Sequence, residues 1–440
     1  MQTRTVFIAH LLSLCAATVA CAQSEHAKKI AASFIGTPFE TYAKDILVNK
    51  PDYVVFAPKK NKRVTGDTYN DHFQVFSKPD GMLFAVWTQA TKEADIDQHI
   101  AFSKSTDQGL TWSEPVVLAG SKNYTNPQLL ASWQQPMVSK SGRIYVLWNQ
   151  QVTSRGPHCG NMFGIYSDNN GEIWSAPKMV PMKRMDRDPQ DPATPPSWCN
   201  WQRPLRLGQD GRYLVGVSRH GQAPYDTKSG CTVEFLQFNN IDDNPNVDAI
   251  RLSWFASNEK ALKVEHPKFG SACEEAGIVK LPDGRLFALM RTCAGHPFWS
   301  QSRDDGVTWS TPKELLDRDG GTPYLHPRSP CPIYDWKGPE AASGTYFALV
   351  HKTFDFDGKN EYQARGPLYL IAGKFNPKAE QPIEFAPAKL FAERPSGNSF
   401  YASSTVVGGK TVLWFPDKKF YLLGRIIGSE WFDGLKQETE

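Results

Sequence analysis

The sequence SRDDGVTW, residues 302–309, is one of three copies of the same turn in this chain. The other copies are STDQGLTW at 105–112 and the weaker SDNNGEIW at 167–174. In the shared pattern Ser-x-Asp-x-Gly-x-Thr-Trp, a short acid can accept hydrogen bonds from the amides of its own turn, and glycine supplies a positive φ. The acid positions are separated by 169 − 107 = 62 and 304 − 169 = 135 residues, roughly one and two units of one period. A repeat of this length predicts the blades of a β-propeller, with these turns at hairpin tips.

A second repeat predicts the number of blades. A turn followed by a β-rich run occurs six times, as KPDGMLFAVW, KSGRIYVLW, GQDGRYLVGV, LPDGRLFALM, ASGTYFALV and VGGKTVLWF. The turn glycines are spaced by 61, 69, 73, 60 and 64 residues, at Gly81, Gly142, Gly211, Gly284, Gly344 and Gly408. We therefore predict an all-β, six-bladed β-propeller at residues 53–440. The strand-like run YVVFAP at 53–58 is expected to complete the last blade, because an open ring would leave unpaired strand edges.

Composition and the N-terminal segment limit location and partners. The formal net charge is +3 over 440 residues, which argues against nucleic acid because a basic stripe is the expected footprint of such a partner. Residues 1–22 have a basic start, an apolar core and an Ala-Cys-Ala end, so they predict a signal peptide and export to the periplasm or the extracellular space. A lipoprotein anchored at Cys21 is the alternative. We predict that residues 23–52 form a lead-in segment before the propeller. Apart from the predicted signal peptide, no segment has the roughly 20 apolar residues needed to span a bilayer. We expect the protein to be a monomer.

Six of the eight cysteines lie beyond the predicted signal peptide. No CxxC or Cys-His spacing typical of structural zinc is present, so we predict no metal and no cofactor, and disulfides in an oxidising compartment are the better expectation. Cys273 lies eleven residues before Gly284 and Cys293 lies nine after it. These positions are nearly opposite on adjacent antiparallel strands, so we predict that the two cysteines are paired or close enough to pair.

Polar residues gather at one predicted rim of the propeller, opposite the glycine turns. The heads of the inner strands carry Asp71, His72, Gln134, Gln135, Gln202, Arg203, Glu274, Glu275, Arg328 and Tyr401. The ends of the second strands add Gln89, Asn149, Arg219, His220, Arg291, His351 and Lys352. Burying charges without partners is unfavourable by several kcal/mol, so their convergence predicts a site for a polar, anionic ligand. Taken singly, such a rim arginine is more often solvated or ion-paired, and Gln134 could simply tie two blades together.

The three turns, LPDGRLFALMRT at 281–292 and FYASSTVVGGKTVLWF at 400–415 resemble the bacterial sialidase (neuraminidase) superfamily of six-bladed propellers with BNR repeats, or Asp boxes. The resemblance covers roughly residues 65–426. It implies a tyrosine nucleophile assisted by a glutamate, an aspartate acid/base near the first blade, and three arginines that grip the substrate carboxylate. The resemblance assigns Tyr401 as nucleophile, Glu275 as its base with Glu274 as the alternative, and Asp71 as acid/base. It also assigns Arg291 as the central clamp and Arg365, in ARGPLYLI, as the fifth-blade clamp, with Arg328 competing.

A tyrosine nucleophile is physically reasonable for such a substrate. A sialic acid carries its carboxylate on the anomeric carbon, so a carboxylate nucleophile would meet like-charge repulsion of about 4 kcal/mol at about 4 Å in an effective dielectric near 20. A neutral phenol avoids this repulsion, but its unperturbed pKa of about 10 then requires a neighbouring base. Sialidases are accordingly an exception to the two-carboxylate scheme of glycosidases.

The sequence leaves three functions open. The leading prediction is a secreted, exo-acting glycoside hydrolase that releases a terminal acidic sugar, sialic acid or a related sugar acid, from glycoconjugates or polysaccharides. Its predicted substrate contacts are Arg291, Arg365, Arg328, His72, Arg203, Gln202, Gln134, Arg219 and His220. The family's first clamp arginine has no match here, the nearest basic residues being Lys59, Lys60, Lys62 and Arg63, and His72, His220 and His326 add imidazoles to the rim. The alternatives are a uronate-directed polysaccharide lyase or atypical glycosidase with a histidine base and Tyr401 as acid, and a non-catalytic carbohydrate-binding propeller.

Overall fold

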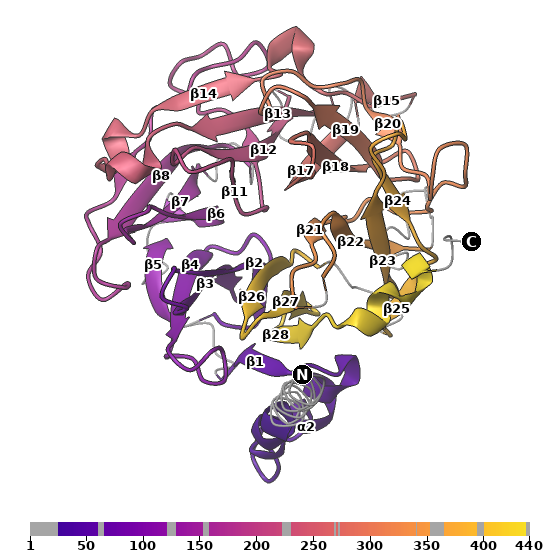
Figure 1. Cartoon of the computed structure of the whole chain (residues 1–440). Coiled ribbons are helices and arrows are strands. Elements are labelled where there is room, and N and C mark those ends of the chain that lie inside the picture. The colour runs from indigo at the N-terminus through magenta and orange to yellow at the C-terminus, as the bar shows by residue number, and fades with distance from the viewer. Residues whose placement is uncertain are drawn as a thin grey trace, which may run out of the picture.

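Six antiparallel sheets surround a central axis, as the prediction of an all-β, six-bladed propeller required (Figure 1). The computed structural model describes residues 25–59, 66–120, 129–152, 158–221, 230–267, 270–271, 273–339, 341–352, 365–393 and 400–436. The predicted signal peptide at 1–22, with Cys15 and Cys21, lies outside these residues, as do Lys60, Lys62 and Arg63.

Each blade is one antiparallel sheet, and in blades one, two and four its strands follow one another outward from the axis in chain order. Blade one holds β2 Tyr69–Ser77, β3 Leu83–Ala90, β4 His99–Ser105 and β5 Val116–Gly120, and blade two holds β6 Ala131–Val138, β7 Ile144–Gln151, β8 Gly160–Ser167 and β9 Lys178–Met179. Blade three holds β10 Trp198–Cys199, β11 Leu205–Arg206, β12 Tyr213–His220, β13 Cys231–Phe238 and β14 Leu252–Phe255, and blade four holds β17 Cys273–Lys280, β18 Leu286–Thr292, β19 Phe298–Ser302 and β20 Lys313–Glu314. Blade five holds β21 Ile333–Asp335, β22 Thr345–His351, β23 Leu368–Phe375, β24 Ile383–Phe385 and β25 Lys389–Ala392. A small hairpin of β15 Glu265–His266 and β16 Gly270–Ser271 lies between blades three and four in the sequence.

Blade six is built from both ends of the propeller sequence. Its inner three strands are β26 Ser403–Val407, β27 Lys410–Asp417 and β28 Tyr421–Ile426, and its outer strand is β1 Tyr53–Phe56. The pairing is antiparallel, with Tyr53 opposite Gly424. The prediction that the run at 53–58 completes the last blade is therefore confirmed, and the pairing closes the ring.

The glycine turns and the Asp boxes lie on the same face. All six predicted turn glycines have positive φ, between 54° at Gly408 and 91° at Gly142. In the box at 302–309, the Asp304 carboxylate accepts hydrogen bonds from the Thr308 amide at 2.8 Å, the Thr308 hydroxyl at 2.6 Å and the Ser302 hydroxyl at 2.8 Å. The box at 105–112 repeats these contacts. The box acid is therefore occupied within its own turn.

The core lies between the blades, in six apolar clusters that each join two neighbouring sheets. Each Asp-box tryptophan packs on the preceding blade. The half-buried indole of Trp309 stacks on Phe235 of blade three, with ring centroids 3.9 Å apart and planes 7° apart, and Trp112 meets Trp414 of blade six edge to face. The boxes thus fasten one blade to the next, which explains why the tryptophan is repeated.

The lead-in segment packs outside the ring (Figure 1). Residues 25–32 are helical, and the short helices α2 Tyr42–Asp45 and η1 Ile46–Asn49 follow. Buried side chains of this segment, Ala27, Ala31, Tyr42 and Ile46, join the cluster between blades five and six. Among the described residues, no helix is long and apolar enough to cross a membrane.

The predicted disulfides are not formed among the six described cysteines, all of which are buried. Cys273 and Cys293 form no disulfide, and the residue opposite Cys273 across β17 and β18 is Thr292. Cys293 follows Thr292, the last residue of β18, and so lies just beyond the strand. The Cys273 thiol instead contacts the Met290 sulfur at 3.3 Å.

Candidate active site

The rim opposite the glycine turns contains a cavity of about 290 Å³. Three inner strands enter it through the same irregularity, a break in register at Asp71/Gln74, Ser132/Gln135 and Glu274/Gly277. At each break one residue has a positive φ: His72 at 52°, Trp133 at 54° and Glu275 at 56°. Such a bulge re-aims a side chain, and all three residues line the cavity. A strained backbone conformation repeated in three blades points to a functional site.

Tyr401, Glu275 and Arg291 are in mutual contact at this cavity, as the sequence predicted. The Tyr401 hydroxyl donates to Glu275 Oε1 at 2.9 Å. Arg291 Nη1 donates to Glu275 Oε2 at 2.7 Å and to the Tyr401 oxygen at 3.0 Å. Tyr401 comes directly before β26 of blade six, whereas Glu275 and Arg291 lie on β17 and β18 of blade four. The contact therefore spans the central axis, and only inward-facing strand heads can produce it.

Two further arginines reach the same cavity. Arg328 Nε donates to Glu274 Oε1 at 2.7 Å, and Arg365 Nη2 donates to the Arg328 carbonyl at 2.6 Å. Both line the cavity together with Arg291. The three guanidinium groups predicted as carboxylate contacts are thus gathered in one place, and two of them, Arg328 and Arg291, are ion-paired with Glu274.

The environment separates the two adjacent glutamates. Burial alone would raise the pKa of Glu274, but Arg291 and Arg328 beside it lower that pKa well below its usual value. Burial and the charge of Glu274 raise the pKa of Glu275 despite its contact with Arg291. Burial and the neighbouring Glu275 also raise the pKa of Tyr401. Adjacent carboxylates with diverging pKa values are typical of a catalytic arrangement.

The other side of Tyr401 is formed by blade one and the last turn of blade six. The His72 ring lies beside the Tyr401 ring with centroids 4.7 Å apart, and burial lowers the pKa of His72 to about 3. Lys419 Nζ bridges Asp71 at 3.0 Å and Glu93 at 3.1 Å, and it lies 5.6 Å from the centre of the Tyr401 ring. Lys419 and Glu93 line the cavity.

Asp71 differs from its predicted acid/base position. Its side chain is fully buried, is ion-paired with Lys419 and accepts a hydrogen bond from the Tyr69 hydroxyl at 3.1 Å. Burial raises its pKa. Asp71 is not among the residues that line the cavity, whereas Tyr69 and Lys419, which cover it, are. Its position supports an indirect role behind Lys419.

Arg219 and Gln134, which were predicted as substrate contacts, are not among the residues that line the cavity. Arg219 is fully buried within blade three, where Nη1 lies 3.1 Å from Asp188 and Nη2 lies 3.3 Å from Glu234. It precedes His220 in β12, so the two side chains point to opposite faces, and of this pair His220 lines the cavity. The Gln134 side-chain amide donates to the His72 carbonyl and so ties blade two to blade one.

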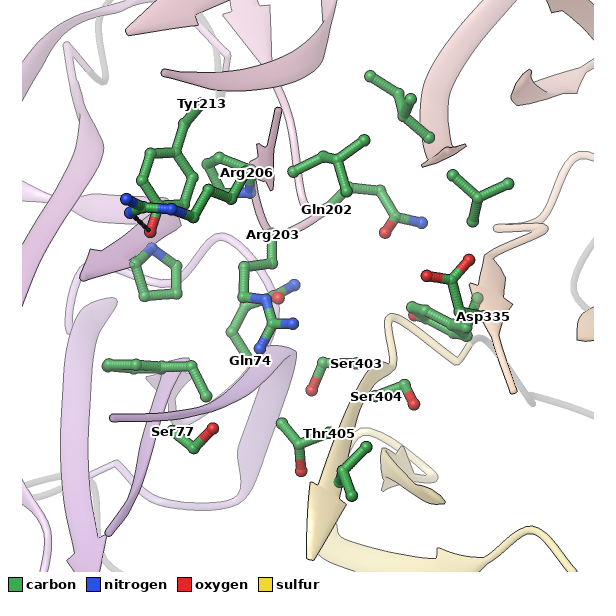
Figure 2. A pocket seen from close by; sticks show the side chains of 18 of the residues that line it. Gln74, Ser77, Gln202, Arg203, Arg206, Tyr213, Asp335, Ser403, Ser404 and Thr405 are labelled. Carbon is green, nitrogen blue, oxygen red and sulfur yellow. Dashed lines mark hydrogen bonds between the residues drawn. The ribbon is translucent and has the colours of Figure 1, made fainter. Parts of the chain in front are cut away.

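Gln202 and Arg203 face a different cavity, of about 440 Å³, on the axis toward the glycine-turn face (Figure 2). Arg203 Nη1 donates to the Val75 carbonyl at 3.1 Å. In blade three it is Trp201, one residue earlier, that packs beside Tyr401, with ring centroids 5.2 Å apart. His326, also expected at the rim, is buried and stacked on His351 at 5.4 Å instead of lining the cavity.

Sequence reasoning missed ten residues that line the cavity: Tyr69, Glu93, Ala94, Gln98, Ser132, Trp133, Gln151, His158, Cys199 and Lys419. A signal for Trp133 was present, because it lies 142 − 133 = 9 residues before its glycine turn, the same interval as 81 − 72 and 284 − 275 for His72 and Glu275. The others lie in loops or at strand ends whose position depends on how neighbouring blades pack, which no local pattern records.

Comparisons with known proteins agree with this architecture. A family model described as a BNR repeat-like domain matches residues 81–340, more than half of the chain. Similar solved structures include the NanB sialidase of Streptococcus pneumoniae, at TM-score 0.58 and 14% identity over 85% of this chain and 69% of that one. The intramolecular trans-sialidase of Ruminococcus gnavus in complex with oseltamivir carboxylate has TM-score 0.56 and 13% identity, over 86% and 97%. The α-L-arabinanase of Penicillium chrysogenum in complex with arabinobiose has TM-score 0.52 and 15% identity, over 86% and 98%. No curated protein matches the chain. At these identities the solved structures establish the fold.

Proposed function

This chain belongs to the family of proteins with a BNR repeat-like domain, and from that premise we propose that it is an exported glycoside hydrolase that removes a terminal acidic sugar, sialic acid or a related sugar acid. Two of the similar structures are sialidases and one is an arabinanase, which supports a glycosidase in general terms. The observation that carries the specific proposal is the contact of the Tyr401 hydroxyl with Glu275 and Arg291. A phenol held against a carboxylate is an activated nucleophile.

In the proposed reaction the Tyr401 oxygen attacks the anomeric carbon while its proton passes to Glu275 Oε1, 2.9 Å away. The glycosidic C–O bond breaks, and an acid protonates the departing oxygen. In the second step water attacks the same carbon and gives a proton to the conjugate base of that acid. The Tyr401–carbon bond then breaks, and Tyr401 recovers its proton from Glu275. The raised pKa of Glu275 suits it to hold that proton between the steps.

We assign the acid/base role to Glu93 in place of Asp71. The Glu93 side chain is 59% exposed and lines the cavity, while the Asp71 side chain is enclosed. An acid must come within hydrogen-bond reach of the departing oxygen, and that oxygen leads to the rest of the glycan at the cavity mouth. Asp71 would then act by holding Lys419 in position.

Cationic groups support recognition of a carboxylate. Arg291, Arg328 and Arg365 line one cavity, and a planar guanidinium can bind a carboxylate through two parallel hydrogen bonds. Lys419 supplies a fourth cation at the edge of the Tyr401 ring, and we propose that it substitutes for the family clamp arginine that the sequence lacks. The volume of about 290 Å³ suits a single sugar unit better than a chain, which supports exo action.

One experiment tests this function. Glycans that end in sialic acid or related sugar acids are incubated with the protein, and the products are separated. We expect a free reducing acidic sugar, and we expect Tyr401→Phe to lower kcat by about 10³-fold or more with little change in substrate binding. Tyr346→Phe is the matched control, because it removes a phenol hydroxyl that donates to the Lys280 carbonyl outside the cavity. Near-normal turnover by Tyr401→Phe would overturn the assignment.

The packing of His72 against Tyr401 favours a second candidate, elimination from a uronate-containing polysaccharide. Burial keeps this imidazole neutral, so it can accept the proton next to the uronate carboxylate while Tyr401 protonates the departing oxygen. The C–O bond then breaks with formation of a C=C bond. The same product analysis separates the two reactions, because elimination gives an unsaturated sugar that absorbs in the near ultraviolet.

A further inference from the structure

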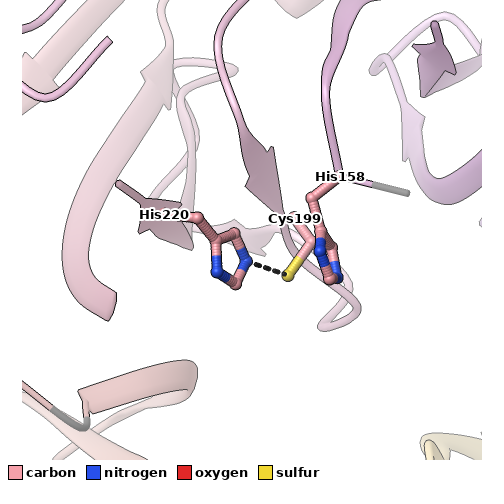
Figure 3. A group of neighbouring side chains, drawn as sticks. All are labelled: His158, Cys199 and His220. Atoms are coloured by element: carbon pink, nitrogen blue, oxygen red, sulfur yellow. Dashed lines mark hydrogen bonds between the residues drawn. The ribbon is translucent and has the colours of Figure 1, made fainter. Parts of the chain in front are cut away.

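Three side chains with metal-ligating atoms meet in the wall of the active-site cavity: His158, Cys199 and His220 (Figure 3). One ligand atom of each lies within 4.8 Å of the other two. Cys199 Sγ is 3.5 Å from His220 Nε2, and the two imidazole rings face each other with centroids 4.3 Å apart. None of the three is assigned a bond-making or proton-transfer step in the reactions proposed above.

The backbone fixes the spacing of this cluster. Cys199 ends β10 and lies opposite Ser218 of β12, the strand that His220 ends. The Trp198 amide donates to the His158 carbonyl at 3.0 Å. The His220 amide donates to the Ser197 carbonyl at 2.9 Å. The three ligand residues are therefore held by hydrogen bonds to a single short segment, residues 197–199, and are preorganised with respect to one another.

The separations suit a small divalent ion. With Zn–S of about 2.3 Å and Zn–N of about 2.0–2.1 Å, tetrahedral ligands lie about 3.3–3.6 Å from one another. The Cys199–His220 distance of 3.5 Å already has this value, and the other ligand-atom separations are at most 4.8 Å, so rotation of the imidazole side chains must close about 1 Å when the ion binds. Two imidazoles and a thiolate form a ligand set that zinc prefers over magnesium or calcium.

We propose that His158, Cys199 and His220 bind one Zn²⁺-class ion whose fourth position opens into the substrate cavity. Three protein ligands with an open fourth position are typical of a zinc site that contacts a water or a substrate. The ligand residues line the same cavity as Tyr401 and Glu275, so an ion here faces the bound sugar from the wall formed by blades two and three. It would coordinate a hydroxyl or carboxylate oxygen of the substrate and so fix the orientation of the ring.

No sequence motif predicts this metal site. The ligands are separated by 199 − 158 = 41 and 220 − 199 = 21 residues, far from the short spacings of zinc-binding motifs. The simpler interpretation is a thiol hydrogen-bonded to an imidazole with no ion. The two interpretations differ in metal stoichiometry, which is measured without any turnover.

The test uses the full chain after chelation and removal of the chelator. Zn²⁺ or Co²⁺ is titrated into the protein, bound metal is counted by elemental analysis, and the Co²⁺ form is followed in the near ultraviolet for a thiolate-to-cobalt charge-transfer band. We expect one ion per chain and a clear band. Cys199→Ala should abolish the band. Loss of a residue that only supports a metal ligand lowers metal affinity by roughly 10–100-fold. Because Cys199 and His220 are ligands themselves, Cys199→Ala and His220→Ala should each weaken zinc binding by at least this factor.

Cys331→Ala is the matched control, because it also removes a buried thiol of the inner strand region but not one of the cluster. It should keep both the stoichiometry and the band. Cys199→Ser preserves shape and serves if the alanine variant folds poorly, with circular dichroism as the check. Absence of stoichiometric binding, or binding that survives both Cys199→Ser and His220→Ala, overturns the proposal. Loss of sugar release by Tyr401→Phe with metal binding retained supports the two proposals separately.

Discussion

Replacement of Arg219 by methionine should destabilise the protein without touching its substrate site. The Arg219 side chain is 0% exposed, and its partners Asp188 and Glu234 are 1% and 0% exposed. Removing one member of a buried ion pair costs about 3–5 kcal/mol, because a charge is left buried without compensation. At about 2.1 cal/mol/K per residue, unfolding 440 residues carries an entropy of about 0.9 kcal/mol/K. The expected fall in Tm is therefore about 3–5 °C.

The matched control is Arg212→Met. Arg212 also pairs with two carboxylates, Asp210 at 2.6 Å and Asp305 at 3.4 Å, but these are 52% and 46% exposed. Exposed pairs contribute about 0–1 kcal/mol, so its Tm should fall by about 1 °C or less. Both variants are melted by differential scanning calorimetry at one scan rate, and substrate affinity is measured on the folded protein. Equal Tm shifts, or an Arg219→Met chain of normal stability with weakened substrate binding, would refute the structural role.

Three further predictions concern pH, the Asp box and the thiols. Burial and the charge of Glu274 raise the pKa of Glu275 above the ordinary 4.5, and the proposed base must be ionised to act. In a pH–rate profile, kcat/KM should therefore fall as the pH falls through a value above 4.5. An acidic limb of the profile at or below 4.5 would contradict the assignment. Asp304→Ala removes the acceptor of both Thr308 hydrogen bonds. It should lower the free energy of unfolding, measured with urea, by about 1–2 kcal/mol and leave kcat and KM unchanged. A fall in kcat at normal stability would instead indicate a catalytic role for this Asp box. The six described cysteines are buried and form no disulfides, so a thiol reagent should react slowly with the native protein and rapidly with all six after denaturation without reductant, while a shortfall after denaturation would indicate disulfides.

The fold could be predicted because its signals are local and repeated. A glycine with positive φ recurs in the inner hairpin of all six blades, so the spacing of these glycines measures the length of a blade. The closing strand at 53–58 followed from the physical cost of an open sheet edge. The contact of Tyr401, Glu275 and Arg291 was predictable for the same reason, since strand heads of a propeller meet at its axis.

The errors arose where a shift of one residue decides which way a side chain points. Arg219 and His220 occupy the same height on β12, but alternation sends one into an ion pair inside the blade and the other into the cavity. A shift of one residue also separates Cys293 from Thr292, the residue opposite Cys273. The number of residues between a side chain and its turn gives the position of that residue along the propeller axis. The sheet face to which the side chain points depends also on bulges such as those at His72 and Glu275. Those bulges are set by packing between blades, which the linear sequence does not display.

The pairing of β1 with β28 means that the ring of blades can close only after the last blade has been synthesised. As the chain is made from its N-terminus, β1 emerges first and has no partner until β28 follows some 360 residues later, at Tyr421–Ile426. Glu275 and Arg291, in blade four, are synthesised before any strand of blade five. The phenol of Tyr401 arrives with the last blade, so a chain that stops early keeps its proposed base and clamp but has nothing to attack a sugar with.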